Sequence, residues 1–235
     1  MMKKHFLALV MGAILIGFSV TSEAEIVSHN DSALVVLDEI KAKDPELVDL
    51  ILGSDSIDDE QKQYWLDAIP TMTDEQRGRI FNILMTEKQK LAKLNLLKQK
   101  RLALQMFLQK LKGEKIDEQE FQKNTQELYD AYQERVNNTD NLFDIKDKVQ
   151  AYYGIAEMYE KGYGRNVDYN QAAKFYLQSH TLETANLDKL VDQSDLGHAS
   201  EALNKLIKQK KITDPNLLKE ITKVLDKAKV STNNQ

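Results

Sequence analysis

A stretch of about 40 residues from Thr73 to Gly113 contains no proline, and we expect nothing within it to end a helix. Thr73 and Gln76 have the spacing of a capping box, in which two side chains satisfy the free backbone amides where a helix begins. At about 1.5 Å per residue, such a helix would be about 60 Å long, which exceeds the width of a small compact domain. The sequence therefore predicts one long helix at about residues 73–112.

The rest of the chain has a similarly helical pattern. Its 235 residues include only three prolines and nine glycines. Apolar residues recur with the 3.6-residue period of a helix, whereas the alternating pattern of a strand is hard to find. We therefore expect an all-α fold in which the long helix packs on shorter N-terminal helices. The predicted N-terminal helices begin at Asn30 or Asp31 (running through Leu34, Val35, Leu37 and Ile40), at Asp44 and at Asp58.

The long helix carries an apolar stripe along one heptad seam. The seam consists of Ile80, Ile83, Leu94, Leu97, Leu104, Leu108 and Leu111, and it is interrupted by Glu87, Lys90 and Arg101. A long apolar stripe has to be covered, either by the flanking helices or by a second copy of the chain. A homodimer through Leu94–Leu111 would make this a self-associating, coiled-coil-like structural protein of the cell envelope, which is one of two functions that the sequence leaves open.

The same helix is the basic element of an otherwise acidic front half. Residues 77–115 contain 11 Lys and Arg against 2 Glu, whereas residues 25–76 contain 14 Asp and Glu against 3 Lys. In one interpretation these charges pair within the molecule or face water, where an exposed pair contributes only about 0–1 kcal/mol. In the other, the helix presents its lysines to an anionic partner, either a lipid headgroup surface or an acidic protein. These lysines are Lys88, Lys90, Lys93, Lys98, Lys100 and Lys112.

Residues 151–180 have the pattern of a helical hairpin. Met158 and Tyr159 lie on the apolar side of a first helix, and Gly162 suits the left-handed position just beyond its end. Asp168 is placed to cap a second helix. A hairpin of this kind buries little surface by itself and normally stacks on neighbours, so it indicates a binding scaffold rather than a reaction pocket. Small residues let its helices approach closely, namely Ala151, Gly154, Ala156, Ala172 and Ala173.

This hairpin resembles a Sel-one-like repeat, a subfamily of the tetratricopeptide-like helical repeats. The matching positions are Ala151, Gly154, Met158-Tyr159, Gly162-Tyr163-Gly164, Asp168-Tyr169, Ala172-Ala173 and Phe175-Tyr176. Residues 197–229 resemble a degenerate second copy that lacks the Gly-x-Gly turn and the closing aromatic pair. The resemblance implies helical hairpins of tetratricopeptide-like type and protein–protein binding on a concave helical surface. Repeats of this family often occur in exported bacterial proteins that assist assembly or host interaction. The resemblance implies no catalytic residues.

We therefore expect a non-catalytic adaptor that binds another envelope or secreted protein and assists envelope assembly or host interaction. The expected partner-binding residues are Tyr152, Tyr159, Tyr163, Arg165 and Tyr176. No cofactor or metal is expected, because the chain has no Cys and its His residues do not stand at metal-ligand spacing. His29, His180 and His198 are expected at surface or cap positions. An enzyme would need a carboxylate pair that meets only in the fold.

The first 24 residues have the three-part pattern of a secretory signal peptide. Lys3 and Lys4 precede an apolar run from Phe6 to Val20, and small residues stand before the expected cleavage site after Ala24. We expect a periplasmic or secreted protein with no further membrane span. Its net charge of −5 makes it a poor candidate for nucleic-acid binding. The predicted regions are the signal peptide at 1–24, an N-terminal helical region at 25–112, a repeat-containing helical region at 113–230 and a disordered tail at 231–235.

Overall fold

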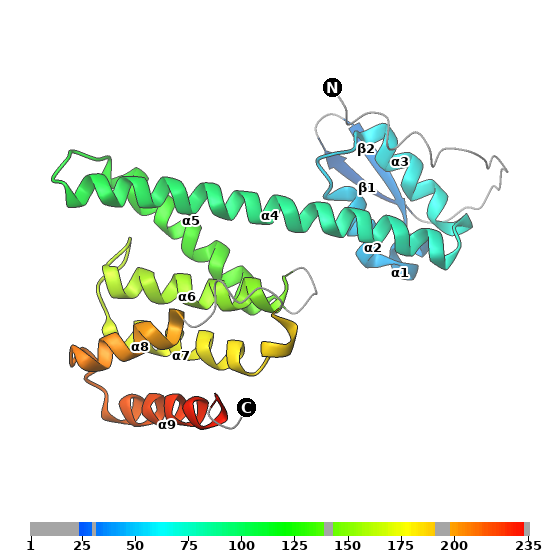
Figure 1. Cartoon of the computed structure of the whole chain (residues 1–235). Coiled ribbons are helices and arrows are strands. Elements are labelled where there is room, and N and C mark those ends of the chain that lie inside the picture. Colours follow the sequence, from blue (N-terminus) through cyan, green and yellow to red (C-terminus); the bar gives the residue numbers. More distant parts are fainter. Residues whose placement is uncertain (1–23, 30–31, 139–142, 191–197, 233–235) are drawn as a thin grey trace, which may run out of the picture. The chain divides into compact units, whose positions relative to one another are not determined.

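The computed structural model describes residues 24–29, 32–138, 143–190 and 198–232 (Figure 1). Helices make up nearly all of the regular structure in these ranges, so the predicted all-α class is confirmed. The chain divides into two compact units, Met1–Leu84 and Met85–Gln235, and this division falls inside the long helix rather than at its end. The predicted signal peptide lies outside the described residues except for Ala24.

The first unit opens with an antiparallel β-hairpin, which corrects the helix predicted to begin at Asn30 or Asp31. Strand β1 (Ala24–His29) pairs with β2 (Ser32–Leu37). Leu34 and Val36 are buried whereas Val35 is exposed, and this period of two belongs to a strand. β-Branched valines also favour strands over helices. The first helix therefore starts only at α1 (Asp38–Lys43), which contains Ile40.

Two further short helices follow α1 in the first unit, before the long helix begins. Asp58 and Gln61 form a capping box at the start of α3, as the sequence predicted. Asp44 stands at the start of α2, but its side chain does not cap the helix. Its carboxylate instead lies 3.5 Å from Arg77 Nε. The elements are α2 (Pro45–Leu52), α3 (Asp59–Ala68) and the 3-10 turn η2 (Ile69–Thr71).

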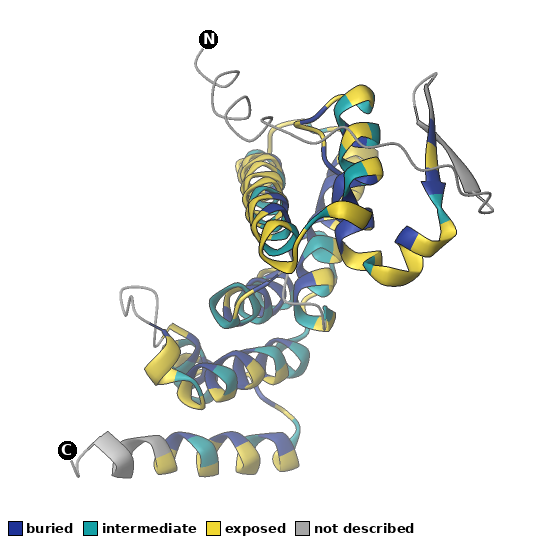
Figure 2. Cartoon of the chain, turned by 90° about the vertical axis from the view of Figure 1, so that its right-hand side faces the viewer, coloured by how far each residue is buried: buried dark blue, intermediate teal, exposed yellow. Residues whose placement is uncertain are grey.

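The long helix is α4 (Asp74–Leu111), 38 residues in one uninterrupted element. It begins with the predicted capping box, in which the Gln76 amide donates to Thr73 Oγ1 at 3.2 Å and the Thr73 amide donates to Gln76 Oε1 at 2.8 Å. The chain leaves the helix at Gly113, whose φ of 76° suits glycine. Figure 2 shows α4 mostly in the colours of exposed and intermediate residues. Its buried residues are Ile80, Leu84, Ala103 and Met106.

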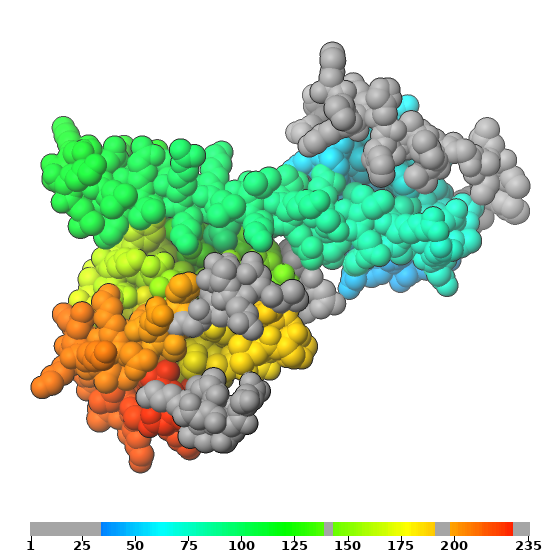
Figure 3. All heavy atoms as spheres, in the orientation of Figure 1, coloured from blue at the N-terminus to red at the C-terminus, as the bar shows by residue number. Residues whose placement is uncertain are grey.

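The second unit contains the basic part of α4 and a series of helices that follow it. Figure 3 shows the side chains of α8 and α9, in orange to red, packed closely on the yellow helix α7. Helix α9 runs to Thr232, which extends regular structure into the predicted disordered tail. The elements are α5 (Glu118–Asn137), α6 (Ile145–Lys161), α7 (Tyr169–Thr184), the 3-10 turn η3 (Leu187–Lys189), α8 (His198–Lys208) and α9 (Pro215–Thr232).

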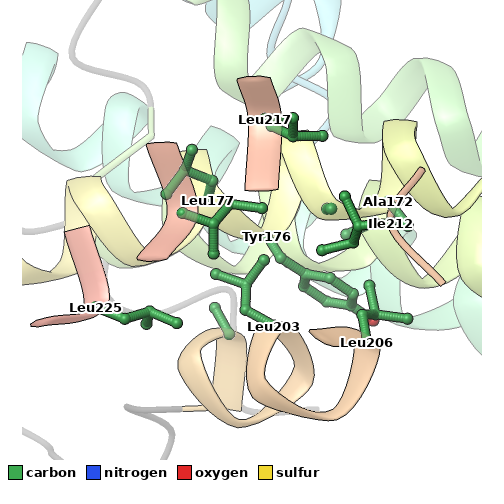
Figure 4. Packing of buried hydrophobic residues seen from close by; sticks show 12 residues of the cluster. Ala172, Tyr176, Leu177, Leu203, Leu206, Ile212, Leu217 and Leu225 are labelled. Carbon is green, nitrogen blue, oxygen red and sulfur yellow. The ribbon is translucent and has the colours of Figure 1, made fainter. Parts of the chain in front are cut away.

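An apolar cluster of this unit joins α6 and α7 to α8 and α9. Figure 4 shows the Tyr176 ring lying among Leu203, Leu206 and Ile212. Ala172 and Ala173 are fully buried, so the small residues of the hairpin do lie where helices meet. Within residues 197–229, predicted as a degenerate second copy, residues 198–208 form α8 and residues 215–229 lie in α9. The assignment of this pair as a repeat stays a prediction.

Candidate functional site

The hairpin predicted at 151–180 is formed by α6 and α7, and its turn has the predicted chemistry. Helix α6 ends at Gly162 in the left-handed conformation, with φ of 69°. The Tyr163 amide then donates to Met158 O at 2.9 Å, which satisfies a carbonyl at the helix end. Asp168 caps α7, because its carboxylate accepts the Asn170 and Gln171 amides at 3.0 and 2.9 Å.

Close approach by α5 explains two of the glycines in this hairpin. A Cβ atom added at Gly154 would overlap the Tyr132 ring of α5. One added at Gly164 would overlap the Thr125 side chain, and φ at Gly164 is 66°, where other residues are strained. Helix α5 therefore forms one wall beside the α6–α7 turn.

Two of the expected partner-binding residues are core residues, which corrects the predicted site. The side chains of Tyr163 and Tyr176 are 7% and 1% exposed. Tyr163 makes edge-to-face contact with Phe107, at 5.1 Å between ring centroids. The Tyr176 hydroxyl donates to Glu160 Oε2 at 2.7 Å. Neither side chain offers a surface to a partner in this fold, because helices distant in sequence cover both.

The other three expected residues are half-buried at the surface of the second unit. Tyr152 and Tyr159 flank Phe175, and the rings of Tyr159 and Phe175 stack at 5.8 Å with an interplanar angle of 5°. The Arg165 guanidinium lies over the Tyr129 ring, 3.3 Å from its centroid, and 5.8 Å from that of Tyr159. The structure thus brings Tyr159 and Arg165 together, with Tyr129 of α5 as the platform for the guanidinium.

Tyr159 and Arg165 also line an open groove of about 550 Å³ beside the α6–α7 turn. Lys110 and Phe121 enter it from α4 and α5, with the Lys110 ammonium 5.1 Å from the Phe121 ring centroid. Sequence reasoning missed both, since no local signal places residues 30 or more positions away at the hairpin. The complete lining is Lys110, Phe121, Gln122, Tyr159, Gly162, Gly164, Arg165, Asn166 and Asp168.

The charged side chains that line the groove differ in whether another group of the protein already binds them. Lys110 forms an ion pair with Glu118, and the Asp168 carboxylate accepts backbone amides. Arg165 donates from Nη2 to the neutral Gln126 side chain at 3.2 Å. Within the described part of the chain, Arg165 has no carboxylate partner, and its buried Nε has no hydrogen-bond acceptor. Arg165 is therefore the cation of this groove that is best placed to bind an anionic group.

Tyr159, the tyrosine that lines the groove, remains a neutral hydrogen-bonding group. Burial raises the pKa of Tyr159, and a hydrogen bond with the Tyr129 side chain raises it further. Burial likewise raises the pKa of Tyr163. The groove can therefore offer a guanidinium, aromatic faces and the neutral hydroxyl group of Tyr159 to a ligand.

One histidine lies in an environment that the sequence did not predict. His180 of α7 is 5% exposed, which corrects its expected surface or cap position. Neither of its ring nitrogens has a hydrogen-bond partner among the described residues. Burial lowers its pKa, and the nearby Glu183 charge only partly opposes that effect.

The described ranges hold no cluster of three or more His, Asp or Glu side chains arranged to bind a metal ion. None of the helices described there combines the length and apolar character needed to cross a bilayer.

Comparison of the chain with protein-family models, with curated proteins and with solved structures found no match. The resemblance of residues 151–180 to a Sel-one-like repeat therefore stays a prediction that rests on the residues themselves.

Proposed function

We propose that this protein is an exported, non-catalytic adaptor that binds an acidic segment of another protein in the groove beside the α6–α7 turn. The observation that carries the proposal is Arg165, held over Tyr129 at 3.3 Å in an open groove without a carboxylate partner among the described residues. The signal-peptide pattern of the first 24 residues supports export. The helical hairpin supports a scaffold rather than an enzyme.

The chemistry of the groove favours a carboxylate next to an apolar side chain. A guanidinium binds a carboxylate through two parallel hydrogen bonds, and such charge-assisted bonds are the strong ones. Stacking on Tyr129 fixes the guanidinium plane before a ligand arrives, which lowers the entropy that binding costs. Phe121 and Tyr159 supply aromatic surface of the kind that anchors protein interfaces. Asp168, which also lines the groove, would repel a second acidic residue of the ligand placed close to it.

Selection of displayed random peptides on the purified protein tests this proposal. The selected peptides are expected to be enriched in Asp or Glu beside an apolar residue, and they are expected to lose binding to Arg165→Glu. Arg165→Lys is expected to bind weakly, since an ammonium group is not planar and cannot form the bidentate pair of hydrogen bonds that a stacked guanidinium forms with a carboxylate. Lys219→Glu, an exposed charge reversal on α9, is the matched control and is expected to bind normally. Equal binding by wild-type protein and Arg165→Glu would reject the groove.

A further inference from the structure

The heptad seam predicted on the long helix is exposed along its basic half. The side chains of Leu94, Leu97, Leu104, Leu108 and Leu111 are 61%, 54%, 45%, 47% and 67% exposed. Of the two alternatives for covering this seam, the flanking helices do not cover it in the second unit, where α4 buries a different face through Ala103 and Met106. The leucines thus form an apolar stripe that the described chain leaves open to solvent.

The stripe has the layout of a coiled-coil seam. Leu94, Arg101 and Leu108 recur every seventh residue, and so do Leu97, Leu104 and Leu111. These two sets stand three residues apart, as a and d positions do, and a strict a/d stripe is the narrow seam that matches one partner helix. The seam drifts by about 20° per heptad around a straight helix, as expected where two helices wind around each other.

The charges beside the seam are all of one sign. With Leu94 at a, the flanking e and g positions include Lys93, Lys98 and Lys100, and Arg101 stands within the seam itself. Lys112 takes the next e position, directly after the last residue of α4. The side chains of all five residues are exposed. Residues at e and g set partner choice through the charges that they meet across the interface.

This charge pattern disfavours a second copy of the same helix as the partner. In a parallel homodimer, Lys93 would meet Lys98 of the other copy, and the two Arg101 side chains would meet in the seam. In an antiparallel homodimer, lysines would again face lysines. Both arrangements set like charges against each other, which is destabilising. The self-associating function predicted as an alternative is therefore disfavoured.

We propose that the outward seam of α4, between Leu94 and Leu111, binds an acidic amphipathic helix of another protein. Acidic residues flanking the seam of that helix would pair with the lysines of α4, and one would lie opposite Arg101. A lipid surface fits less well, because the stripe is narrow, contains an arginine and has no exposed aromatic residue, whereas helices that lie in a bilayer interface present a wide face with Trp or Phe. This site is separate from the groove at Arg165.

Two synthetic peptides test the proposal directly on the full chain. Both consist of four heptads with Leu at a and d, and they carry either Glu or Lys at every e and g position. The acidic peptide is expected to bind at least about tenfold more tightly than the basic one, since several opposite-charge contacts replace like-charge contacts. Its affinity is expected to fall as salt is raised, because exposed charges are screened.

Matched variants separate the apolar and charged contributions. The double variant Leu97→Ser, Leu104→Ser is expected to lose binding without loss of helical circular dichroism, because both side chains are exposed. The triple variant Lys98→Glu, Lys100→Glu, Lys112→Glu is expected to reverse the preference between the peptides. The control triple Lys208→Glu, Lys219→Glu, Lys223→Glu changes net charge equally on other helices and is expected to behave as wild type.

Three results would overturn the proposal. One is equal binding of both peptides, or of neither. Another is self-association of the wild-type chain at micromolar concentration by sedimentation, abolished in the double serine variant. The last is seam-dependent binding to vesicles of phosphatidylcholine and phosphatidylserine without binding to the acidic peptide.

Discussion

The hydroxyl of Tyr176 donates a hydrogen bond to Glu160 Oε2 at 2.7 Å, while Lys205 donates to Glu160 Oε1 at 2.8 Å. One carboxylate thereby joins α6 to α7 and α8. Burial by itself would raise the pKa of the Glu160 carboxyl, but the hydrogen bonds from Lys205 and Tyr176 outweigh it and hold the pKa below its usual value. The hairpin is thus fastened to the next helix by a polar contact beside its apolar cluster.

Removing the Tyr176 hydroxyl is expected to destabilise the second unit. Tyr176→Phe keeps the ring in the core but deprives a largely buried carboxylate of a donor, at a cost of about 1–3 kcal/mol in the free energy of unfolding. Urea denaturation followed by circular dichroism measures the change. Tyr152→Phe, a half-buried tyrosine of the same hairpin, serves as the control and is expected to change little. Equal stability of Tyr176→Phe and wild type would show that the hydrogen bond contributes nothing.

A pair of glycine substitutions is expected to shift stability in opposite directions. Gly154→Ala forces a Cβ atom into the Tyr132 ring, and overpacking of this kind costs about 1–3 kcal/mol. Gly78→Ala in α4 meets no atom within 4 Å, and a helix interior gains about 0.5–1 kcal/mol when Ala replaces Gly. Thermal unfolding of both variants measures the difference. A lower melting temperature for Gly78→Ala, or an unchanged one for Gly154→Ala, would contradict the packing described for these sites.

His180 is expected to make stability depend on pH. Its folded-state pKa is lowered by burial from the ordinary value of 6.5, so below that pH the unfolded chain takes up a proton that the folded chain does not. Above pH 6.5, His180 is neutral in both states and does not reduce the free energy of unfolding. As the pH falls from 6.5 toward the folded-state pKa, the free energy of unfolding decreases. Urea midpoints from neutral pH downward measure the slope. His180→Leu is expected to flatten the slope, because this variant removes the buried titrating group.

Local chemistry was predictable from the sequence because it depends on residues within one helical turn. The capping boxes at Asp58 and Thr73, the cap at Asp168 and the left-handed Gly162 all lie where the pattern placed them. The strand at Ser32–Leu37 was missed because a short apolar run does not by itself distinguish a strand from a buried helix segment.

The candidate site was only partly predictable because its surroundings come from distant segments. The hairpin pattern marked Tyr159, Tyr163, Arg165 and Tyr176 alike, yet the helices that cover Tyr163 and Tyr176 decide which of them reach the surface. Lys110 belongs to a helix that ends well before the hairpin begins. The periodicity of a sequence shows which residues share one face of a helix. It does not show which other helix packs against that face.

The long helix illustrates the same limit. Its length, its cap and its leucine seam follow from the sequence. In the second unit, α4 instead buries the face that carries Ala103 and Met106. The small side chain of Ala103 lets another helix approach this face closely. The most apolar stripe was therefore not the buried one.

The most direct measurement is site-specific photo-cross-linking from the groove in living cells. A photoreactive amino acid at Asn166, an exposed groove residue, is expected to capture one discrete protein partner through an acidic segment. The same probe at Lys219 on α9 controls for random contact. Capture at Asn166 that disappears with Arg165→Glu and persists at reduced yield with Arg165→Lys is the predicted result. Capture at Asn166 that is unchanged by Arg165→Glu, or no greater than capture at Lys219, would contradict the account.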